Sequence, residues 1–453
     1  MALKHYVGTL LILCLFGFFK ELKPSEPYLT EYLTGFEYKN LTKDDVYQKV
    51  YPVWSYAYFF VLIPVFLLTD LVRYKPMIMF EGLVYVVTWV LLLWAEGVVA
   101  MQVMQFIYGM ATASEVAYYT YIYAKVPKTD YMRVSSLTRF SILMGKFVSG
   151  LLSQLLDTFD VRAAAVPYIR MGKFVSGLLS QLLDTFDVVD YRELNYISLG
   201  GVSTAFILCI FLPSIKTSIY FHHKDPDNDT LQEPNGHKDR GLCFRASQLL
   251  WNHAKDSYRQ NYVIKWSIWV AASTCLNFQI GNYIQPLWQE IQVDQEDSEL
   301  FNGGVEAVTT LLGALIVALV GLVKFNWSKS GDYAILLISV LGAIVLAVMS
   351  QTQSIWVAYV GYILIRMSYQ LLMTVASFEL ASHIPNDSSG LVFGLNTWVA
   401  LGLQSLLTLA VADSVGLALP IRDQFVVYAS LYGLVGVFFA SYFLLKAYCD
   451  MKR

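Results

Sequence analysis

The chain has 453 residues, of which 56% are hydrophobic and only 15% are charged, and its formal net charge is −3. Soluble domains carry about 25% charged residues, so this composition excludes an ordinary soluble domain and favours a membrane protein with many spans. The charge gives no indication of nucleic-acid binding, and the spacing of cysteines and histidines predicts neither a metal site nor a disulfide framework.

Twelve stretches of about 20 mostly apolar residues are long enough to cross a bilayer. Six precede a polar stretch at residues 222–245 and six follow it. In chain order they lie near 7–30, 52–71, 77–98, 102–124, 137–157 and 196–214, and then near 262–287, 303–324, 333–350, 354–375, 391–412 and 424–446. Two six-helix halves joined by a hydrophilic loop is the arrangement of major facilitator transporters.

We therefore expect an all-α membrane protein of two six-helix bundles embedded in the lipid bilayer. The first bundle is expected over residues 1–214, a cytoplasmic central loop over 215–261, and the second bundle over 262–453. Basic residues follow the second and fourth spans, fill the central loop and end the chain, as Arg73, Lys128, Lys224 and Arg453 illustrate. The positive-inside rule then predicts that both termini are cytoplasmic.

The sequence has four glycosylation sequons, and only one falls in a loop predicted to lie outside. That sequon is Asn40-Leu41-Thr42, between the first two spans, whereas Asn228, Asn326 and Asn386 fall elsewhere. Asn40 is therefore the predicted glycan acceptor.

An exact repeat interrupts the first half: Met144–Val161 recurs letter for letter as Met171–Val188. Divergent structural repeats do not stay identical, so the repeat is either a recent duplication or an error in the sequence. A thirteenth span would reverse the second half and place its basic loops outside. We expect the first copy to form the fifth span, because it continues from Arg139, and residues 162–188 to form an extra excursion on the outside.

Few ionisable residues lie at membrane depth, and Glu115 is the best placed of them because at least seven uncharged residues flank it on each side. A charge at that depth usually faces a polar cavity, although a buried structural pair is the alternative.

Glu26 lies between Pro24 and Pro27, which would break the first helix. Broken helices are tolerated where they line a cavity, so we favour a cavity for Glu26, with the outer headgroup region as the alternative.

Three further charges are candidates for the same cavity. Arg366 in the tenth span could be the countercharge of Glu115 or could bind an anionic substrate. Lys146 in the fifth span is a second cation, with a stem long enough to reach the interface if it lies near a span end. Glu306 opens the eighth span, as a functional carboxylate or as a charge stabilised by the helix dipole.

Several specific strings are spread over nearly the whole chain. They are Pro24-Ser-Glu26-Pro-Tyr-Leu, Tyr51-Pro-Val-Trp54-Ser-Tyr, Pro64-Val-Phe-Leu-Leu-Thr-Asp70-Leu-Val-Arg73-Tyr-Lys75-Pro, Glu115-Val-Ala-Tyr-Tyr, Phe301-Asn302-Gly-Gly-Val-Glu306 and Leu391-Val-Phe-Gly-Leu-Asn396. Together they resemble the reduced folate carrier family, which includes the thiamine transporters. The resemblance implies a carrier, not an enzyme, that moves a water-soluble B vitamin across the plasma membrane by alternating access and needs no cofactor.

Within this resemblance, the charge of the cavity predicts the substrate. Folate carriers place Arg and Lys at the positions matching Glu115 and Gln404, whereas this chain has Glu and Gln there, as thiamine carriers do. A carboxylate in a cavity of low dielectric attracts the thiazolium cation and repels a folate dianion. Asn282 also matches the thiamine carriers.

By resemblance, the predicted thiamine contacts are Glu115, Trp54, Tyr51, Tyr118 and Asn282, and we add Glu26, Gln285 and Glu306. Lys146 departs from the thiamine carriers, which have an aromatic residue there, and pairing of Lys146 with Glu115 would weaken the preference for a cation.

Two other functions remain open from the sequence. One is a carrier of reduced folate or another organic anion that uses Arg366 and Lys146. The other is a membrane receptor that binds a vitamin without moving it. Proton exchange through Glu26, Glu115 and Glu306 is a possible coupling mode for the carrier.

Overall fold

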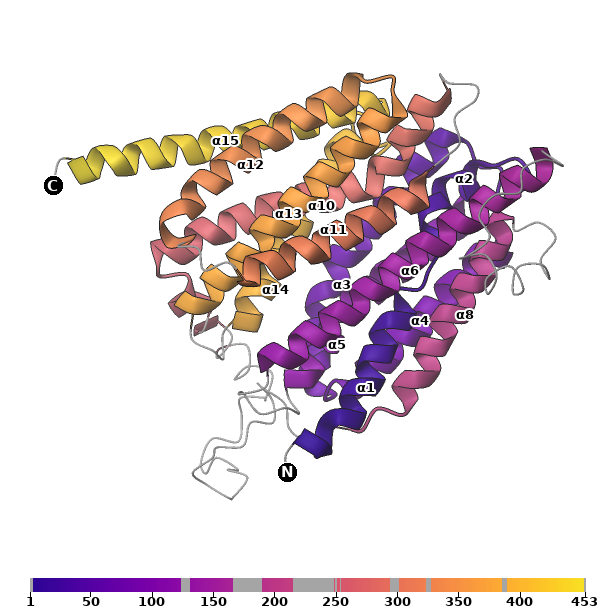
Figure 1. The fold of residues 1–453 in the computed structure, drawn as a ribbon, viewed down its shortest axis with the longest axis horizontal. Coiled ribbons are helices and arrows are strands. Elements are labelled where there is room, and N and C mark those ends of the chain that lie inside the picture. Colours follow the sequence, from indigo (N-terminus) through magenta and orange to yellow (C-terminus); the bar gives the residue numbers. More distant parts are fainter. Residues whose placement is uncertain are drawn as a thin grey trace.

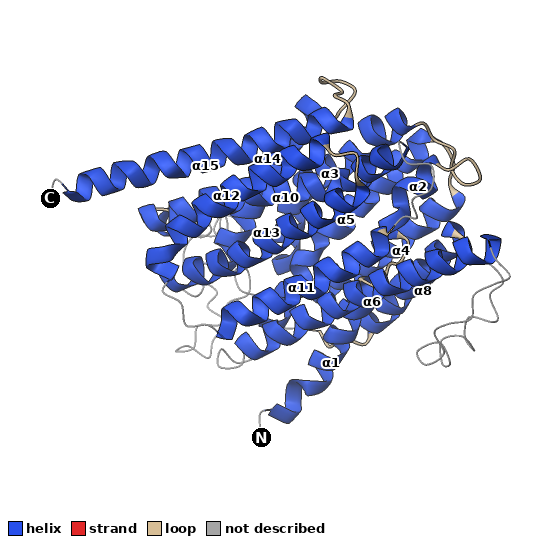
Figure 2. Ribbon diagram, turned by 45° about the horizontal axis from the view of Figure 1, so that its top comes forward, coloured by secondary structure: helices blue, strands red, loops and turns tan. Residues whose placement is uncertain are grey.

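A computed structural model describes residues 3–123, 131–165, 190–214, 248, 251–252, 254–293, 301–322, 327–384 and 389–451. These residues form helices joined by loops, without a strand among them (Figure 2). The polar stretch at 222–245, the basic residues Lys128 and Lys224, and the second copy of the repeat lie outside the described residues.

Twelve long helices occur in the described ranges, six on each side of residues 215–247. The first six are α1 (Leu3–Lys20), α3 (Tyr51–Leu71), α4 (Lys75–Trp94), α5 (Val98–Tyr123), α6 (Tyr131–Ala165) and α8 (Tyr191–Ile210). Three short elements lie between α1 and α3: the 3-10 turn η1 (Glu26–Tyr28), α2 (Leu29–Thr34) and the π-helical turn η2 (Asp45–Val50). The last six are α10 (Asn261–Val293), α11 (Asn302–Leu322), α12 (Trp327–Gln351), α13 (Ile355–His383), α14 (Ser389–Val411) and α15 (Ile421–Met451).

Seven helices in the described parts of the chain are long and apolar enough to cross a membrane by themselves. They include the segments Lys75–Trp94 of α4 and Ser330–Gln351 of α12, which have mean hydropathies of 2.0 and 2.5. Other long helices, such as α5 and α10, contain more polar residues, which lowers their mean hydropathy. The expected all-α membrane architecture is confirmed.

The first span is broken where its prolines predict a break. The α-helical part ends at Lys20, and the chain turns before it resumes as η1 and α2. Pro24 lacks a backbone N–H and disfavours helical geometry in the residue before it, so a helix cannot run through this segment unchanged. The apolar run near 7–30 is therefore one helix followed by two short ones.

Two pairs of helices join the halves: α6 packs against α11, and α3 packs against α14. The first copy of the repeat, Met144–Val161, lies within α6, which Figure 1 shows alongside α11. Glycines bring these two backbones together, because a Cβ on Gly150 would lie 2.8 Å from both Ala307 N and Gly303 O. Small residues permit this close approach of helices within a membrane.

Both chain termini lie at the end of the helix array away from α2 (Figure 1). The helix array therefore has two ends: α2 and the short turns lie at one, and the chain termini lie at the other. We use the name "α2 end" for the first of these below.

Candidate functional site

One face of α5 carries a row of polar side chains. Tyr108, Thr112, Glu115 and Tyr119 are spaced by three or four residues, which places them on the same side of the helix. The Trp54 indole Nε1 donates a hydrogen bond to Thr112 Oγ1 at 3.2 Å, and the Tyr119 hydroxyl donates to Glu115 Oε1 at 3.3 Å. This row brings predicted contacts from α3 and α5 together.

Lys20, the last residue of α1, supplies the cation beside Glu115. Its Nζ lies 2.9 Å from Glu115 Oε1 and 2.9 Å from Glu81 Oε1. The Lys20 and Glu81 side chains are 1% and 0% exposed, whereas the Glu115 side chain is 25% exposed. We call these three residues the Lys20 cluster. With all three ionised, the cluster has one net negative charge, and Glu115 is its accessible member.

Tyr118 covers the cation of this cluster. The Lys20 ammonium lies 4.6 Å from the centroid of the Tyr118 ring, a distance at which a cation is attracted to the face of the ring. Gly17 on α1 makes this placement possible, because a Cβ there would lie 2.3 Å from the Tyr118 hydroxyl. The Tyr118 side chain is fully buried. In this conformation it therefore contacts Lys20, and its predicted contact with a substrate stays a prediction.

A second group of charges, the Lys23 cluster, consists of Lys23, Glu21, Glu26 and Lys146. The Lys23 Nζ lies 2.7 Å from Glu26 Oε1 and 3.7 Å from Glu21 Oε2, and Lys146 Nζ also lies 3.7 Å from Glu21 Oε2. Lys23 and Glu21 are buried, whereas Glu26 is 39% exposed and Lys146 is 49% exposed. Two ammonium groups facing two carboxylates give this cluster no net charge when all are ionised.

The sequence left open whether Lys146 pairs with Glu115, which would weaken the preference for a cation. The structure instead pairs Glu115 with Lys20 and Lys146 with Glu21. The reason is geometric: Lys20, the last residue of α1, reaches Glu115 on α5, whereas the next residue, Glu21, reaches Lys146 on α6. The charge of Lys146 is therefore balanced without Glu115.

Arg366 on α13 belongs to the C-terminal half of the site. Its Nη1 donates to Asn277 Oδ1 at 2.7 Å, and its guanidinium lies 5.8 Å from the centroid of the Tyr362 ring. The Tyr362 hydroxyl donates to Glu306 Oε1 at 2.8 Å. Arg366 and Glu306 thus share one aromatic neighbour. The structure gives Glu115 a different cation from the one that the sequence suggested.

The side of α10 that meets Trp54 of α3 carries two other predicted contacts, Asn282 and Gln285. Phe278, Asn282 and Gln285 are spaced by four and three residues and so lie on one face. The Phe278 ring packs edge-on against Trp54 of the other half, with centroids 6.2 Å apart. Asn282, one turn along, has a buried Nδ2 without a hydrogen-bond partner. Buried amides are normally satisfied, so this donor is available to a bound molecule.

Hydrogen bonds from α10 join the halves at the α2 end. The Gln285 amide Nε2 donates to the Glu26 carbonyl at 2.7 Å, and its Oε1 accepts from Thr30 N at 3.2 Å and Thr30 Oγ1 at 3.1 Å. The Tyr51 hydroxyl is 2.7 Å from Thr30 Oγ1. Gln285 and Tyr51, both predicted contacts, therefore take part in closing this end.

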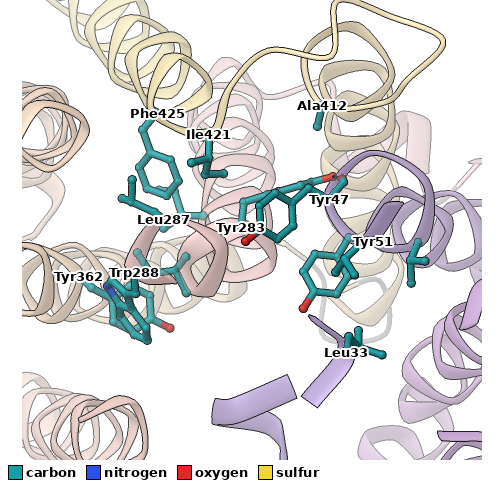
Figure 3. Packing of buried hydrophobic residues seen from close by; sticks show 14 of the residues in the cluster. Leu33, Tyr47, Tyr51, Tyr283, Leu287, Trp288, Tyr362, Ala412, Ile421 and Phe425 are labelled. Atoms are coloured by element: carbon teal, nitrogen blue, oxygen red, sulfur yellow. Dashed lines mark hydrogen bonds between the residues drawn. The ribbon is translucent and has the colours of Figure 1, made fainter. Parts of the chain in front are cut away.

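Apolar side chains from both halves seal the same region (Figure 3). Leu33 and Tyr51 come from the N-terminal half, and Tyr283, Leu287 and Trp288 come from α10. The rings of Tyr51 and Tyr283 meet at 6.3 Å in an edge-on arrangement. All five side chains are buried. The α2 end is therefore closed in this conformation.

A separate hollow of about 310 Å³ lies between α10 and α15, lined by residues that include Lys265, Ile268 and Phe439. The predicted contacts lie elsewhere, on α3, α5 and α10 and, for Glu26 and Glu306, on η1 and α11. This hollow therefore does not belong to the candidate site.

Comparison with protein families identifies the fold and the family. The family profile of the reduced folate carrier matches residues 4–169 and 161–427. The chain belongs to the reduced folate carrier family. The two matched stretches overlap over residues 161–169, from the last residue of the first copy of the repeat to two residues before the second copy.

Characterised relatives cover almost the whole carrier. It is 40% identical to thiamine transporter 1 of Mus musculus, an alignment that covers 95% of this chain and 88% of the relative. It is 36% identical to thiamine transporter 2 of Homo sapiens, with coverages of 96% and 89%. It is also 38% identical to folate transporter 1 of Caenorhabditis elegans, with coverages of 97% and 92%.

Solved structures of transporters share the fold at low sequence identity. A POT family transporter in complex with a thioalcohol-conjugated peptide superposes with a TM-score of 0.65 and 10% identity, over 96% of this chain and 95% of that one. The nucleoside transporter NupG gives 0.59 and 12%, over 96% and 99%. These likenesses confirm the major facilitator fold. The family and the membrane-span helices identify the carrier as a multi-pass membrane transporter.

Sequence reasoning missed Lys20 and Glu81 as members of the carrier's site. Lys20 ends an apolar run and reads as a flanking charge, and Glu81 lies five residues into a predicted span near 77–98. Glu81 carried the same signal as Glu115, a carboxylate within an apolar stretch, and that signal was sufficient to find it.

Proposed function

We propose that this carrier moves thiamine across the plasma membrane by alternating access. The observation that carries the proposal is the Lys20 cluster, in which Glu115 is the accessible carboxylate of a group with one net negative charge. A monocation bound beside Glu115 makes that group neutral. The names of the mammalian relatives support the same substrate.

The surroundings of Glu115 suit a flat cation. Trp54 lies on the same side, held by Thr112 one turn before Glu115, and Phe278 meets Trp54 from the opposite half. Aromatic rings bind flat heterocycles by stacking and bind cations through the ring face. The Asn282 Nδ2 supplies a hydrogen-bond donor on the α10 side. These groups would bind the two rings of thiamine between the halves.

The alternating-access step rests on the packing of the halves. They meet through α3 with α14 and α6 with α11, while Gln285 and the apolar seal close the α2 end. We infer that residues 1–214 and 262–453 move as two bundles linked by the loop at 215–261. Breaking the Gln285 contacts would open the site toward the α2 end.

The proposal also includes an orientation of the carrier in the membrane. Asn40 is exposed, lies in the loop between α2 and η2, and has a left-handed backbone with φ of 49°. The termini lie at the other end of the array (Figure 1). With the α2 end outside, Asn40 receives the glycan and both termini are cytoplasmic. Loss of a glycosidase-sensitive mobility shift in Asn40→Gln is the expected result, and an unchanged shift would contradict this orientation.

A reduced folate is the second candidate substrate. It is favoured by the likeness to the nematode folate transporter and by Arg366, whose Nη1 bonds to the neutral amide of Asn277. An anion bound to Arg366 would be repelled by the negative charge of Glu115 in the same cavity. That repulsion is the reason for preferring thiamine.

Reconstituted vesicles test the proposal. Purified carrier in liposomes loaded with unlabelled thiamine should accumulate labelled thiamine transiently above equilibrium, because a carrier exchanges the two. A protein that only binds its ligand gives saturable binding without this counterflow. Counterflow with a reduced folate but not with thiamine would overturn the substrate assignment.

A further inference from the structure

Glu81 is a buried carboxylate that contacts no part of the accessible site directly. Its side chain is 0% exposed, its Oε1 pairs with Lys20, and its Oε2 is buried without a hydrogen-bond partner. A buried ion of this kind is costly unless its charge is compensated. A fully apolar residue at this place on α4 would pack without that cost, so the carboxylate calls for an explanation in terms of charge.

Counting the charges around Lys20 supplies an explanation for the Glu81 carboxylate. Among the described residues, the carboxylates in ion-pair contact with Lys20 are Glu81 and Glu115. If Glu81 were neutral, the single ammonium of Lys20 would cancel the charge of Glu115 completely. With Glu81 ionised, the ammonium is shared, and one negative charge remains.

The remaining charge is felt where a ligand can reach it. Glu115 is 25% exposed, whereas Lys20 and Glu81 are shielded by protein. The neighbouring Lys23 cluster, with Lys146 and Glu26 as its exposed members, is balanced and does not change this sum. The sign of the N-terminal half of the cavity therefore depends on Glu81.

We propose that Glu81 is a specificity-determining positioning residue, which acts through Lys20 to keep Glu115 available to a cationic substrate. This inference rests on the proposed function for the identity of the cation. It assigns to Glu81 no contact with substrate. The net charge of the Lys20 cluster, not the presence of Glu81 as such, then sets the preference for a cation over an anion.

Other charged and titratable groups also surround Glu81, and the proposal must hold with them present. Glu21 directly follows the end of α1, and Tyr118 comes from α5, Cys209 from α8 and Tyr85 from α4 itself. Glu21 is compensated by Lys23 and Lys146. The tyrosine and cysteine side chains are neutral acids, so they leave the charge of the Lys20 cluster unchanged.

Two variants with opposite predictions test this role. Glu81→Gln keeps the Lys20–Glu115 ion pair and leaves the cluster neutral, so the KM for thiamine uptake should rise about tenfold or more. Lys20→Met combined with Glu81→Gln removes one charge of each sign and restores one net negative charge. Because the net charge of the cluster is again that of wild type, its KM should return to within about threefold of the wild-type value.

Controls separate charge from folding. Glu379→Gln removes another buried carboxylate, from α13 in the C-terminal half, and should leave the KM unchanged. Surface expression and the Tm of each purified variant show whether it is folded. A folded Glu81→Gln variant with wild-type KM would overturn the proposal, and so would a folded double variant that is no better than Glu81→Gln.

The wild-type measurement in the same experiment tests the proposed function separately. If wild type transports thiamine and Glu81→Gln is normal, the function stands and the inference fails. If wild type transports a reduced folate instead, the proposed function fails, and the inference then predicts that Glu81→Gln lowers the KM for folate. An unchanged or raised folate KM in that case would refute the role of Glu81.

Discussion

Replacing Glu115 by glutamine tests the electrostatic account of substrate binding most simply. Glutamine has nearly the same size and still accepts a hydrogen bond from Tyr119, which lies 3.3 Å from Glu115 Oε1. Lys20 keeps its ion pair with Glu81 at 2.9 Å, so no unpaired charge is left in the interior. The change therefore removes one negative charge from the accessible end of the Lys20 cluster and little else.

The structure sets the size of the expected effect. A substrate cation about 5 Å from the carboxylate gains roughly 3 kcal/mol at an effective dielectric constant of about 20. Because the Glu115 side chain is 25% exposed, water screens part of this attraction. Allowing for half of it leaves about 1.5 kcal/mol, which corresponds to a roughly tenfold higher KM for thiamine.

Initial rates of labelled thiamine uptake over a range of concentrations measure this effect in cells or vesicles with matched amounts of carrier. The Glu115→Gln variant should show the rise in KM, and Glu379→Gln, which removes a buried carboxylate away from the site, should not. A Glu115→Gln variant that is correctly folded and has the wild-type KM would refute the reasoning, because its only change is the charge.

Three further predictions follow from the contacts around the site. Lys146→Met should change the KM for thiamine less than threefold, because the Lys146 side chain is 49% exposed and water screens its charge; a tenfold fall in KM would show that Lys146 opposes the cation. Gln285→Leu removes the bonds to Thr30, so a cysteine placed at Asn282 should react faster with a thiol reagent added from the α2 end, and an unchanged rate would contradict the closure. Gly150→Val should lower the Tm of the purified carrier by several degrees, because its side chain meets the α11 backbone; a Tm equal to wild type would show that the helices separate freely.

The sequence predicted the fold well because the signal for a membrane helix is local. A span needs only a long apolar run, and the break after Lys20 follows from the chemistry of Pro24. The helix bounds were less accurate: the fifth span was expected at 137–157, and α6 extends over Tyr131–Ala165. Polar residues near helix ends are invisible to a count of apolar residues, although the helix continues through them.

The site was predicted only in part because its partners are distant in sequence. Lys20 is 61 residues from Glu81 and 95 from Glu115, so no spacing rule connects them. The identity of the accessible carboxylate could be predicted from one apolar run, but its cation depends on how α1 packs against α4 and α5. Tyr118 illustrates the same limit, because helical periodicity cannot tell a ring that faces a cavity from one that covers a buried lysine.

Competition between the two candidate substrates tests the central claim most directly. Cells that express this carrier would be given labelled thiamine with an excess of either unlabelled thiamine or a reduced folate. Saturable uptake that unlabelled thiamine blocks and folate does not is the predicted result, because the accessible charge at Glu115 is negative. Absent thiamine uptake together with saturable uptake of labelled folate would contradict it, and would mean that Arg366 sets the sign of the cavity.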